Sequence, residues 1–176
     1  VEYFELASEN EWVRSDARAV TRWYNGKVGD LNAGESDGSQ MRRVTKLTKK
    51  LARSRKEWKA ETTSGITVTK LVTDHFSASE DRDDKALRDT WKAIHEALDK
   101  STEVNHPVLD TMLAEAGDAQ VQFFCTCLAD ALKILEDLDE GDYTRQKARV
   151  TWDEVFDTTY FSDQPNNDDQ SGGKGS

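Results

Sequence analysis

Apolar residues recur along the chain at the spacing of an α-helix, and this periodicity limits the fold more than any other feature. The most regular run consists of Val121, Phe124, Leu128, Leu132, Leu135 and Leu138. Residues at such intervals form one apolar stripe on one side of a helix. Strand-type alternation is scarce, and the 176 residues include only two prolines. The sequence therefore predicts a mainly α-helical protein.

The helical segments form a predicted bundle-like lobe of about six helices, preceded by two short strands within residues 1–14. The first helix is expected to start after Ser15 or Asp16 and to stop near Gly26 or Gly29. Further helices are expected from Ser39 to the segment ETTSG, from Ser64 to Phe76, around Leu87–Leu98, from Pro107 to Gly117, along the stripe described above, and around Tyr143–Phe156.

The chain is expected to begin inside a larger protein, because Val1 is not a start methionine and VEYFEL has no leader character. Residues 1–14 are expected to form short strands, and 15–161 to form the helical lobe. Residues 162–176 are acidic and rich in Gly and Ser, which predicts a disordered tail. No apolar run is long enough to span a bilayer, so no membrane partner is expected.

The two cysteines, Cys125 and Cys127, lie two positions apart on a predicted helix. Their side chains would point about 200° apart, so they cannot readily form a disulfide with each other. A zinc site is not predicted either, because no further ligand has suitable spacing. Free thiols are typical of a reducing compartment, and the sequence predicts a cytoplasmic protein.

The charge distribution is strongly uneven. Nine of the 24 basic residues fall between Met41 and Lys59, opposed there only by Glu57, while the rest of the chain has a net charge of −18. Helical spacing places an apolar stripe on one side of this segment and Arg42, Lys46, Lys49 and Arg53 on the other. The acidic remainder disfavours DNA and anionic membranes. The basic segment therefore predicts that an anionic ligand binds at this part of the protein and not elsewhere on its surface.

The basic helix is followed by a short turn and by Ser64-Gly65 at the start of another helix. Lysines supply point charges to a polyphosphate, and a helix N-terminus with a serine hydroxyl supplies further donors. Together they would form a triphosphate clamp. The alternative is a solvated basic face beside an ordinary helix cap.

No self-contained active site is visible. Gly-x-Ser-x-Gly, P-loop and Gly-x-Gly-x-x-Gly motifs are absent from the sequence. Gly38-Ser39 resembles the Gly-Ser pair of polymerase-β-type nucleotidyltransferases, but the next acidic residue is Glu57. The Asp-x-Asp pairs further on, Asp81–Asp83 and Asp137–Asp139, lie at predicted helix ends without a preceding strand, and we interpret them as solvated charges. We interpret Ser39 as a helix cap, and we predict no catalytic residue and no metal ligand in this chain.

Four segments, in this order, resemble the C-terminal helical half of bacterial CD-NTases, the cyclic GMP-AMP synthase and DncV-like nucleotidyltransferases of antiphage signalling. They are EWVRSDARAVTRWYN, MRRVTKLTKKLARSRKEW, TSGITVTKLV and ARVTWDEVF. The resemblance covers about residues 1–161. It implies a polymerase-β-like catalytic lobe plus a helical lobe, with nucleotides bound between them. Residues 1–14 would then be the tail end of the catalytic core.

The resemblance also implies nucleotide-binding residues. Lys49 matches the family lysine that contacts the donor triphosphate, and Ser64 matches the serine that joins it. Lys46 and Arg42 are further candidates on the same face. Lys50 stays open as an alternative to Lys49, because the two differ by a slip of one residue.

The family's three metal-binding carboxylates normally precede the segment that resembles Val1 onward. The resemblance therefore implies Mg²⁺ held outside this chain, ATP- or GTP-type nucleoside triphosphates as ligands, the N-terminal catalytic lobe as partner, and no catalysis by this chain alone. This sequence departs from the family pattern at Ala17 (commonly proline), Asp157 (usually glycine) and Ile66 (aromatic in some members). The residues alone leave open a free-standing nucleotide- or RNA-binding module, and a helical interaction domain without a ligand.

Overall fold

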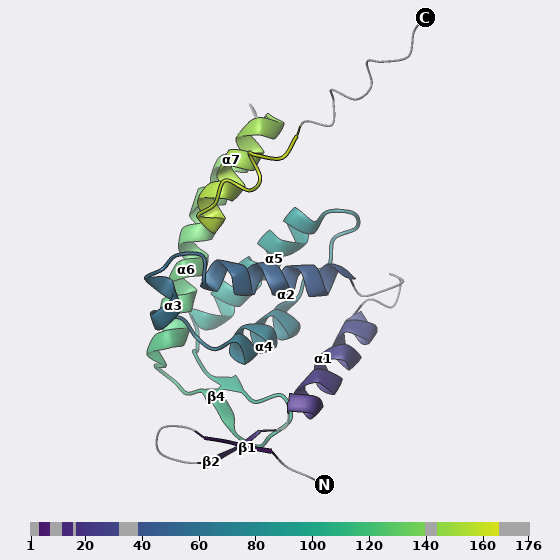
Figure 1. Ribbon diagram of the computed structural model, residues 1–176, viewed down its shortest axis with the longest axis vertical. Helices are drawn as coiled ribbons and strands as arrows, with labels where there is room; N and C mark the ends of the chain where they lie inside the picture. Colours follow the sequence, from purple (N-terminus) through teal and green to yellow (C-terminus); the bar gives the residue numbers. More distant parts are fainter. Residues whose placement is uncertain (1–3, 8–11, 16, 32–38, 140–143, 166–176) are drawn as a thin grey trace, which may run out of the picture.

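The computed structural model describes residues 4–7, 12–15, 17–31, 39–139 and 144–165. These residues are mostly helical, as predicted (Figure 1). The helices are α1 (Ala17–Leu31), α2 (Ser39–Ala52), α3 (Trp58–Glu61), α4 (Gly65–His75), α5 (Asp83–Leu98), α6 (Ala119–Glu136), the 3₁₀ helix η1 (Asp137–Asp139) and α7 (Arg145–Phe156). Two antiparallel hairpins pair β1 (Phe4–Ala7) with β2 (Trp12–Ser15) and β3 (Val104–Asn105) with β4 (Met112–Ala114).

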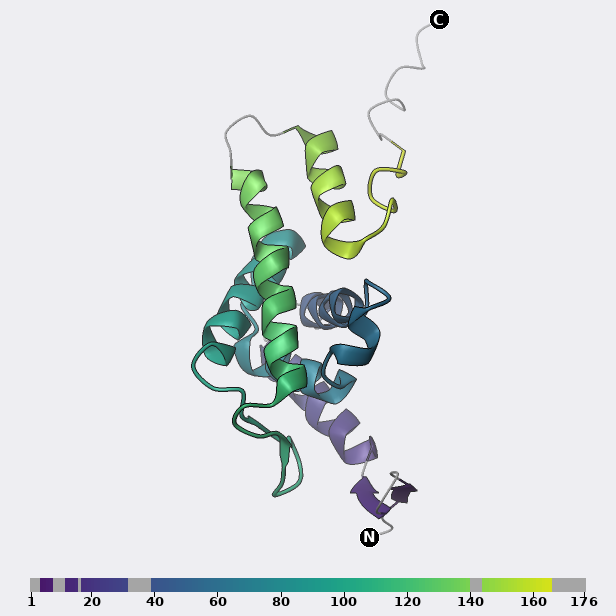
Figure 2. The same ribbon diagram turned by 90° about the vertical axis from the view of Figure 1, so that its left-hand side faces the viewer.

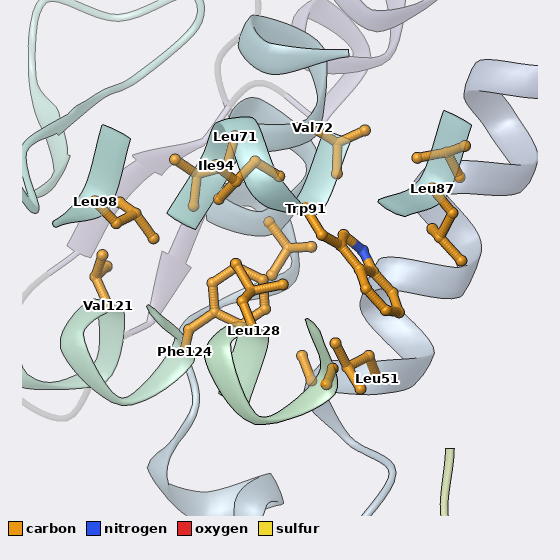
Figure 3. Packing of buried hydrophobic residues seen from close by; sticks show 14 of the residues in the cluster. Leu51, Leu71, Val72, Leu87, Trp91, Ile94, Leu98, Val121, Phe124 and Leu128 are labelled. Carbon is orange, nitrogen blue, oxygen red and sulfur yellow. The ribbon is translucent and has the colours of Figure 1, made fainter. Parts of the chain in front are cut away.

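Helix α5 lies at the centre of the core, because α2, α4 and α6 all pack against it. It buries the residues that its periodicity predicts, Leu87, Trp91, Ile94 and Leu98. Figure 3 shows these side chains beside the buried stripe of α6, which includes Val121, Phe124 and Leu128. Helix α7 lies beside α6 at one end of the molecule, and the β1–β2 hairpin lies at the opposite end (Figure 2).

Trp91 connects α5 to two other helices. Its indole N–H donates a hydrogen bond to Oγ1 of Thr48 on α2 at 2.9 Å, and both side chains are fully buried. Its ring also packs edge-on against Trp152 and Phe156 of α7, with centroid distances of 6.3 and 6.1 Å. A buried indole N–H needs such an acceptor, so this hydrogen bond fixes how α2 sits on the core.

Helix α1 does not stop where the sequence analysis placed its end. It continues through Gly26 and Gly29 to Leu31. Neither glycine has the positive φ of a left-handed helix cap, which among the described glycines occurs at Gly117. Both glycines therefore lie inside the helix, and the prediction of a stop there was wrong.

The predicted long helix after Ser39 is divided into α2 and the short helix α3. Helix α2 ends at Ala52, and turns occupy the residues before Trp58. Arg55 explains the break, since its guanidinium donates to the carbonyl oxygens of Glu154 and Val155 at the end of α7. The same group lies 4.2 Å from the centroid of the Trp58 ring. These tertiary contacts override the helical propensity of the local sequence.

The helix predicted between Pro107 and Gly117 is wrong, because this segment forms the turn and the second strand of the β3–β4 hairpin. His106 closes the turn: its ring Nδ1 accepts hydrogen bonds from the backbone N–H groups of Val108 and Leu109, and its backbone N–H donates to the carbonyl oxygen of Thr111. Partial burial lowers the pKa of His106, which favours the neutral ring that can accept these bonds. The helix was predicted because four apolar residues have helical spacing, namely Val108, Leu109, Met112 and Leu113.

The segment after α7 folds back onto that helix. The buried carboxylate of Asp153 accepts hydrogen bonds from the backbone N–H groups of Phe161 and Ser162 at 2.8 and 2.9 Å. Burial alone would raise the pKa of Asp153, but the hydrogen bonds from Ser162 and Phe161 outweigh it and lower the pKa. The rest of the predicted tail, residues 166–176, lies outside the described residues, as do Gly141 and Tyr143.

Helix α6 carries both cysteines, and both are free thiols, as predicted. Burial and the charge of Asp130 raise the pKa of Cys127 to about 12. A neutral buried thiol behaves as a small apolar side chain. No helix in the described part of the chain combines the length and hydrophobicity needed to cross a membrane.

Thr48→Val should destabilise the protein by about 1–3 kcal/mol, because it leaves the buried Trp91 N–H without an acceptor. Urea denaturation followed by tryptophan fluorescence measures this change. Thr126→Val is the matched control, since the exposed Thr126 hydroxyl donates to the Gln122 carbonyl of its own helix, and it should stay within about 0.5 kcal/mol of wild type. Equal stability of the two variants would contradict the assigned role of Thr48.

Asp153→Asn should make stability less dependent on acid pH. A carboxylate with a lowered folded-state pKa stabilises the fold above its unfolded pKa of about 3.9 and loses this contribution as pH falls through the folded value. The variant should melt at a lower temperature than wild type at pH 7, and its melting temperature should fall less steeply than that of wild type below about pH 4. Melting curves across this range test the effect, with Asp110→Asn, an exposed carboxylate of the β3–β4 turn, as the control.

Candidate anion-binding site

Helix α2 presents one packed side and one charged side, as its sequence predicts. The inner side buries Met41, Val44, Thr48, Leu51 and Ala52. The exposed side carries Arg42, Lys46, Lys49 and Lys50. The structure places these four cations in different surroundings, so they are not one uniform surface.

Lys49 and Arg53 approach the N-terminus of α4. A side-chain carbon placed on Gly65, the first residue of α4, would lie 3.9 Å from both Cε of Lys49 and Nη2 of Arg53. Ser64 is the N-cap residue immediately before it. We call these four residues, Lys49, Arg53, Ser64 and Gly65, the cradle. A glycine at this position keeps the space between the two cations and the helix end free of side-chain atoms.

The local sequence explains why α4 begins at the cradle. Ser64 has an extended backbone, and its Oγ accepts a hydrogen bond from the backbone N–H of Thr67 at 3.3 Å. The Ser64 carbonyl accepts from Val68 at 3.0 Å, which closes the first helical turn. The backbone N–H groups of Gly65 and Ile66 precede the first intrahelical donor and have no acceptor within the helix. They give the cradle the partial positive charge of a helix N-terminus.

Among the described residues, no carboxylate forms an ion pair that would balance the positive charge of the cradle. Within the described residues, neither Lys49 nor Arg53 forms an ion pair. The Lys49 residue lies at the surface, yet partial burial of its ammonium group lowers its pKa, and the charge of Arg53 lowers it further. Two like charges and a helix N-terminus in one place favour the binding of an anion, which would offset this repulsion.

Arg42, one of the predicted site residues, is held by α1. Its Nη2 donates to Oδ1 of Asn25 at 3.0 Å, and its guanidinium lies 5.8 Å from the centroid of the Tyr24 ring. Tyr24 also donates a hydrogen bond to Thr45 of α2 at 2.8 Å. Arg42 therefore joins α2 to α1. Lys46 is exposed on α2 between Arg42 and the cradle.

The structure thus brings two of the predicted residues, Lys49 and Ser64, to the same place. It adds Arg53, which the set of proposed nucleotide-binding residues did not include. The signal for Arg53 was its spacing of four residues from Lys49 on the predicted basic face. Gly65 was recognised as part of a cap, but only the three-dimensional structure shows both cations beside it.

The cradle does not suit Mg²⁺. Magnesium binds oxygen ligands, above all carboxylates, whereas the cradle offers an ammonium, a guanidinium and N–H donors. Nowhere in the described ranges do three or more His, Cys, Asp or Glu side chains form a cluster able to hold a metal ion. We therefore assign no metal-dependent step to the described residues.

A hollow of about 540 Å³ lies elsewhere, between the end of α5 and the start of α6, and its lining contains no cradle residue. The buried polar residue in its lining is already engaged: the Thr102 hydroxyl donates to the Glu115 carbonyl and accepts from two backbone N–H groups. Burial raises the pKa of Cys125 in this hollow, and the charge of Asp99 raises it further, so the thiol is neutral. The hollow offers neither a nucleophile nor concentrated charge.

The fold recurs in nucleotidyltransferases of the DncV type. Vibrio cholerae DncV cyclic AMP-GMP synthase, solved with the linear intermediate 5′ pppA(3′,5′)pG, matches with a TM-score of 0.64 at 17% sequence identity. Escherichia coli DncV in its 3′-deoxy GTP bound form matches with a TM-score of 0.63 at 18% identity. No protein-family model matches the chain, and no curated protein matches its sequence.

Both matches cover 86% of this chain but only 38% and 40% of the two DncV chains. The chain therefore has the fold of less than half of a DncV enzyme. The resemblance to CD-NTases seen in the sequence motifs is confirmed at the level of the fold.

Gly65→Asp should stabilise the protein and block the cradle. The new carboxylate would lie beside Lys49 and Arg53 and in the first turn of α4, where an anion is worth about 0.5–1 kcal/mol. Gly65→Asn, which has the same shape without the charge, is the control. Thermal melting at low and high salt measures the difference, and inorganic triphosphate should raise the melting temperature of wild type but not of the Asp variant. Equal stability of both variants at low salt would contradict an unbalanced positive site.

Proposed function

We propose that this chain is the triphosphate-binding helical lobe of a nucleotidyltransferase that joins nucleoside triphosphates into cyclic di- or oligonucleotides for antiphage signalling. The observation that carries the proposal is the cradle, in which two cations that form no ion pair with any described carboxylate meet the N-terminus of α4. The DncV fold supports it, since both matched DncV structures contain ligands with phosphate groups.

The cradle offers a triphosphate three kinds of donor. Lys49 supplies a point charge, and Arg53 supplies a planar guanidinium that can bind two phosphate oxygens at once. The backbone N–H groups of Gly65 and Ile66 and the Ser64 hydroxyl supply uncharged donors at the helix end. Such a set favours a triphosphate over a monophosphate, because more phosphate oxygens find donors and more negative charge meets the two cations.

The proposal assigns phosphate recognition, and not base recognition, to these residues. The residue after Gly65 is Ile66, an aliphatic side chain that cannot stack on a base as an aromatic ring does. Lys46 and Arg42 are placed in the proposal as outer residues of the basic face, more distant from the helix end than Lys49. Selectivity for ATP or GTP would come from another part of the enzyme.

In this proposal the carboxylates that hold Mg²⁺ belong to the N-terminal catalytic lobe, which is the partner of this chain. The described residues supply binding and orientation of the triphosphate and do not catalyse the reaction alone. We propose a cytoplasmic location, where nucleoside triphosphates are abundant and the two thiols stay reduced.

A second candidate function is RNA binding by a free-standing module. The observation in its favour is that exposed lysines flank the cradle on both sides along the chain: Lys46 and Lys50 on α2, Lys56 in the turn after α2, and Lys59 on α3. RNA binding through such lysines would weaken steeply with salt and would not distinguish ATP from AMP.

Lys49→Met should weaken ATP binding about 10- to 100-fold, because a hydrogen bond to a charged group contributes about 1.5–3 kcal/mol. Lys50→Met is the matched control: it removes the same charge from the next residue of α2, which is exposed and not part of the cradle. Isothermal titration with ATP and with AMP measures the affinities, and wild type should prefer ATP.

Three results would contradict the proposal. They are equal affinity for ATP and AMP, an equal loss in the Lys49→Met and Lys50→Met variants, or tight binding of single-stranded RNA with no measurable binding of ATP. The last result would favour the RNA-binding module.

A further inference from the structure

Thr67 lies behind the cradle, on the inner side of Ser64. It is the third residue of α4, and its side chain is almost fully buried, with 1% of the residue exposed. Its Oγ1 lies 2.9 Å from Oγ of Ser64, close enough for a hydrogen bond in which either hydroxyl could be the donor. The direction of this bond decides what Ser64 can offer to a ligand.

The surroundings of Thr67 fix that direction. Other buried threonines of α2 and α4 donate their hydroxyl proton to the carbonyl four residues earlier, as shown by Thr45, Thr48, Thr69 and Thr73. The Thr67 hydroxyl makes no such bond within the described residues, and its hydrogen-bonding partner there is Ser64. Because buried hydroxyl protons are almost always donated to an acceptor, Thr67 is the donor and Ser64 the acceptor.

Ser64 then accepts two hydrogen bonds, one from the Thr67 hydroxyl and one from the Thr67 backbone N–H. A serine oxygen has two lone pairs and one proton, so both acceptor sites are occupied. Its proton is left for a third partner. Since Ser64 is exposed and adjoins Gly65 in the cradle, that partner can be a ligand.

We propose that Thr67 is a positioning residue that makes the Ser64 hydroxyl a hydrogen-bond donor to phosphate. By filling both lone pairs of Ser64, Thr67 keeps them away from the anion and directs the proton toward it. The inference rests on the proposed triphosphate function of the cradle, because the Ser64 hydroxyl that Thr67 orients is one of the donors of the cradle. Thr67 itself does not touch the ligand.

The test compares Thr67→Val, Thr67→Ser and Ser64→Ala in the full chain by isothermal titration with ATP. Thr67→Val keeps the shape but removes the hydroxyl, and it should weaken binding about tenfold, as expected for a hydrogen bond to a charged group. Thr67→Ser should bind like wild type, because it restores the donor. Thr73→Val is the control: it removes another buried hydroxyl from α4 that bonds to Thr69, and its affinity should not change.

The double variant Ser64→Ala/Thr67→Val separates a positioning role from an independent one. If Thr67 acts through Ser64, the double variant should bind no more weakly than Ser64→Ala alone. Additive losses would overturn the inference, as would wild-type affinity of Thr67→Val when Ser64→Ala is weakened. Should Thr67→Val fail to fold, Thr67→Ala takes its place.

Failure of the proposed function gives a different pattern. If Lys49→Met and Ser64→Ala both bind ATP as tightly as wild type, the cradle is not the triphosphate site, and the inference on Thr67 falls with it. If these two variants are weakened and Thr67→Val is not, the proposed function stands and only the inference on Thr67 is overturned.

Discussion

The buried hydrogen bond from Trp91 to Thr48 is the contact on which the candidate site depends. It fixes the rotation of α2 on the core, because an indole N–H at full burial must keep its acceptor. With Thr48 facing inward, the next residue, Lys49, is turned toward the surface at the start of α4. Helix α4 is itself packed on both α2 and α5, so the three helices hold the cradle between rigid elements.

The sequence predicted those elements whose stability comes from their own apolar periodicity. Helices α5 and α6 bury the stripes read from the sequence, and α4 starts after Ser64 through a local side-chain cap. Prediction failed where distant contacts decide the outcome. The break after Ala52 depends on Arg55, whose partners lie about a hundred residues later in α7. The β3–β4 hairpin depends on the His106 ring accepting backbone N–H groups, a bond without a periodic signature.

The candidate site shows the same division. Lys49 and Ser64 were proposed from a resemblance, and the structure places them together. Arg53 and Thr67 were not proposed, because their importance depends on side-chain placement across two helices. Arg42 shares the helical face of Lys49, yet Asn25 and Tyr24 hold its guanidinium at α1. Helical spacing predicts which residues share a face, and it does not predict which neighbour each long side chain will contact.

The balance of charge explains why the cradle can be selective in an acidic protein. Several other cations are paired with a nearby aspartate, as in Arg43–Asp83, Lys70–Asp74, Arg82–Asp84, Lys85–Asp89 and Arg88–Asp139. Such pairs contribute little to stability when exposed, but they cancel positive charge that would attract anions elsewhere. The charges of Lys49 and Arg53 are not cancelled in this way, and the surrounding negative surface repels polyanions that do not fit. A small, highly charged phosphate group is therefore attracted to the cradle and repelled over most of the protein. The ion pairs elsewhere on the surface contribute to this selectivity as much as the two cations that bind the ligand.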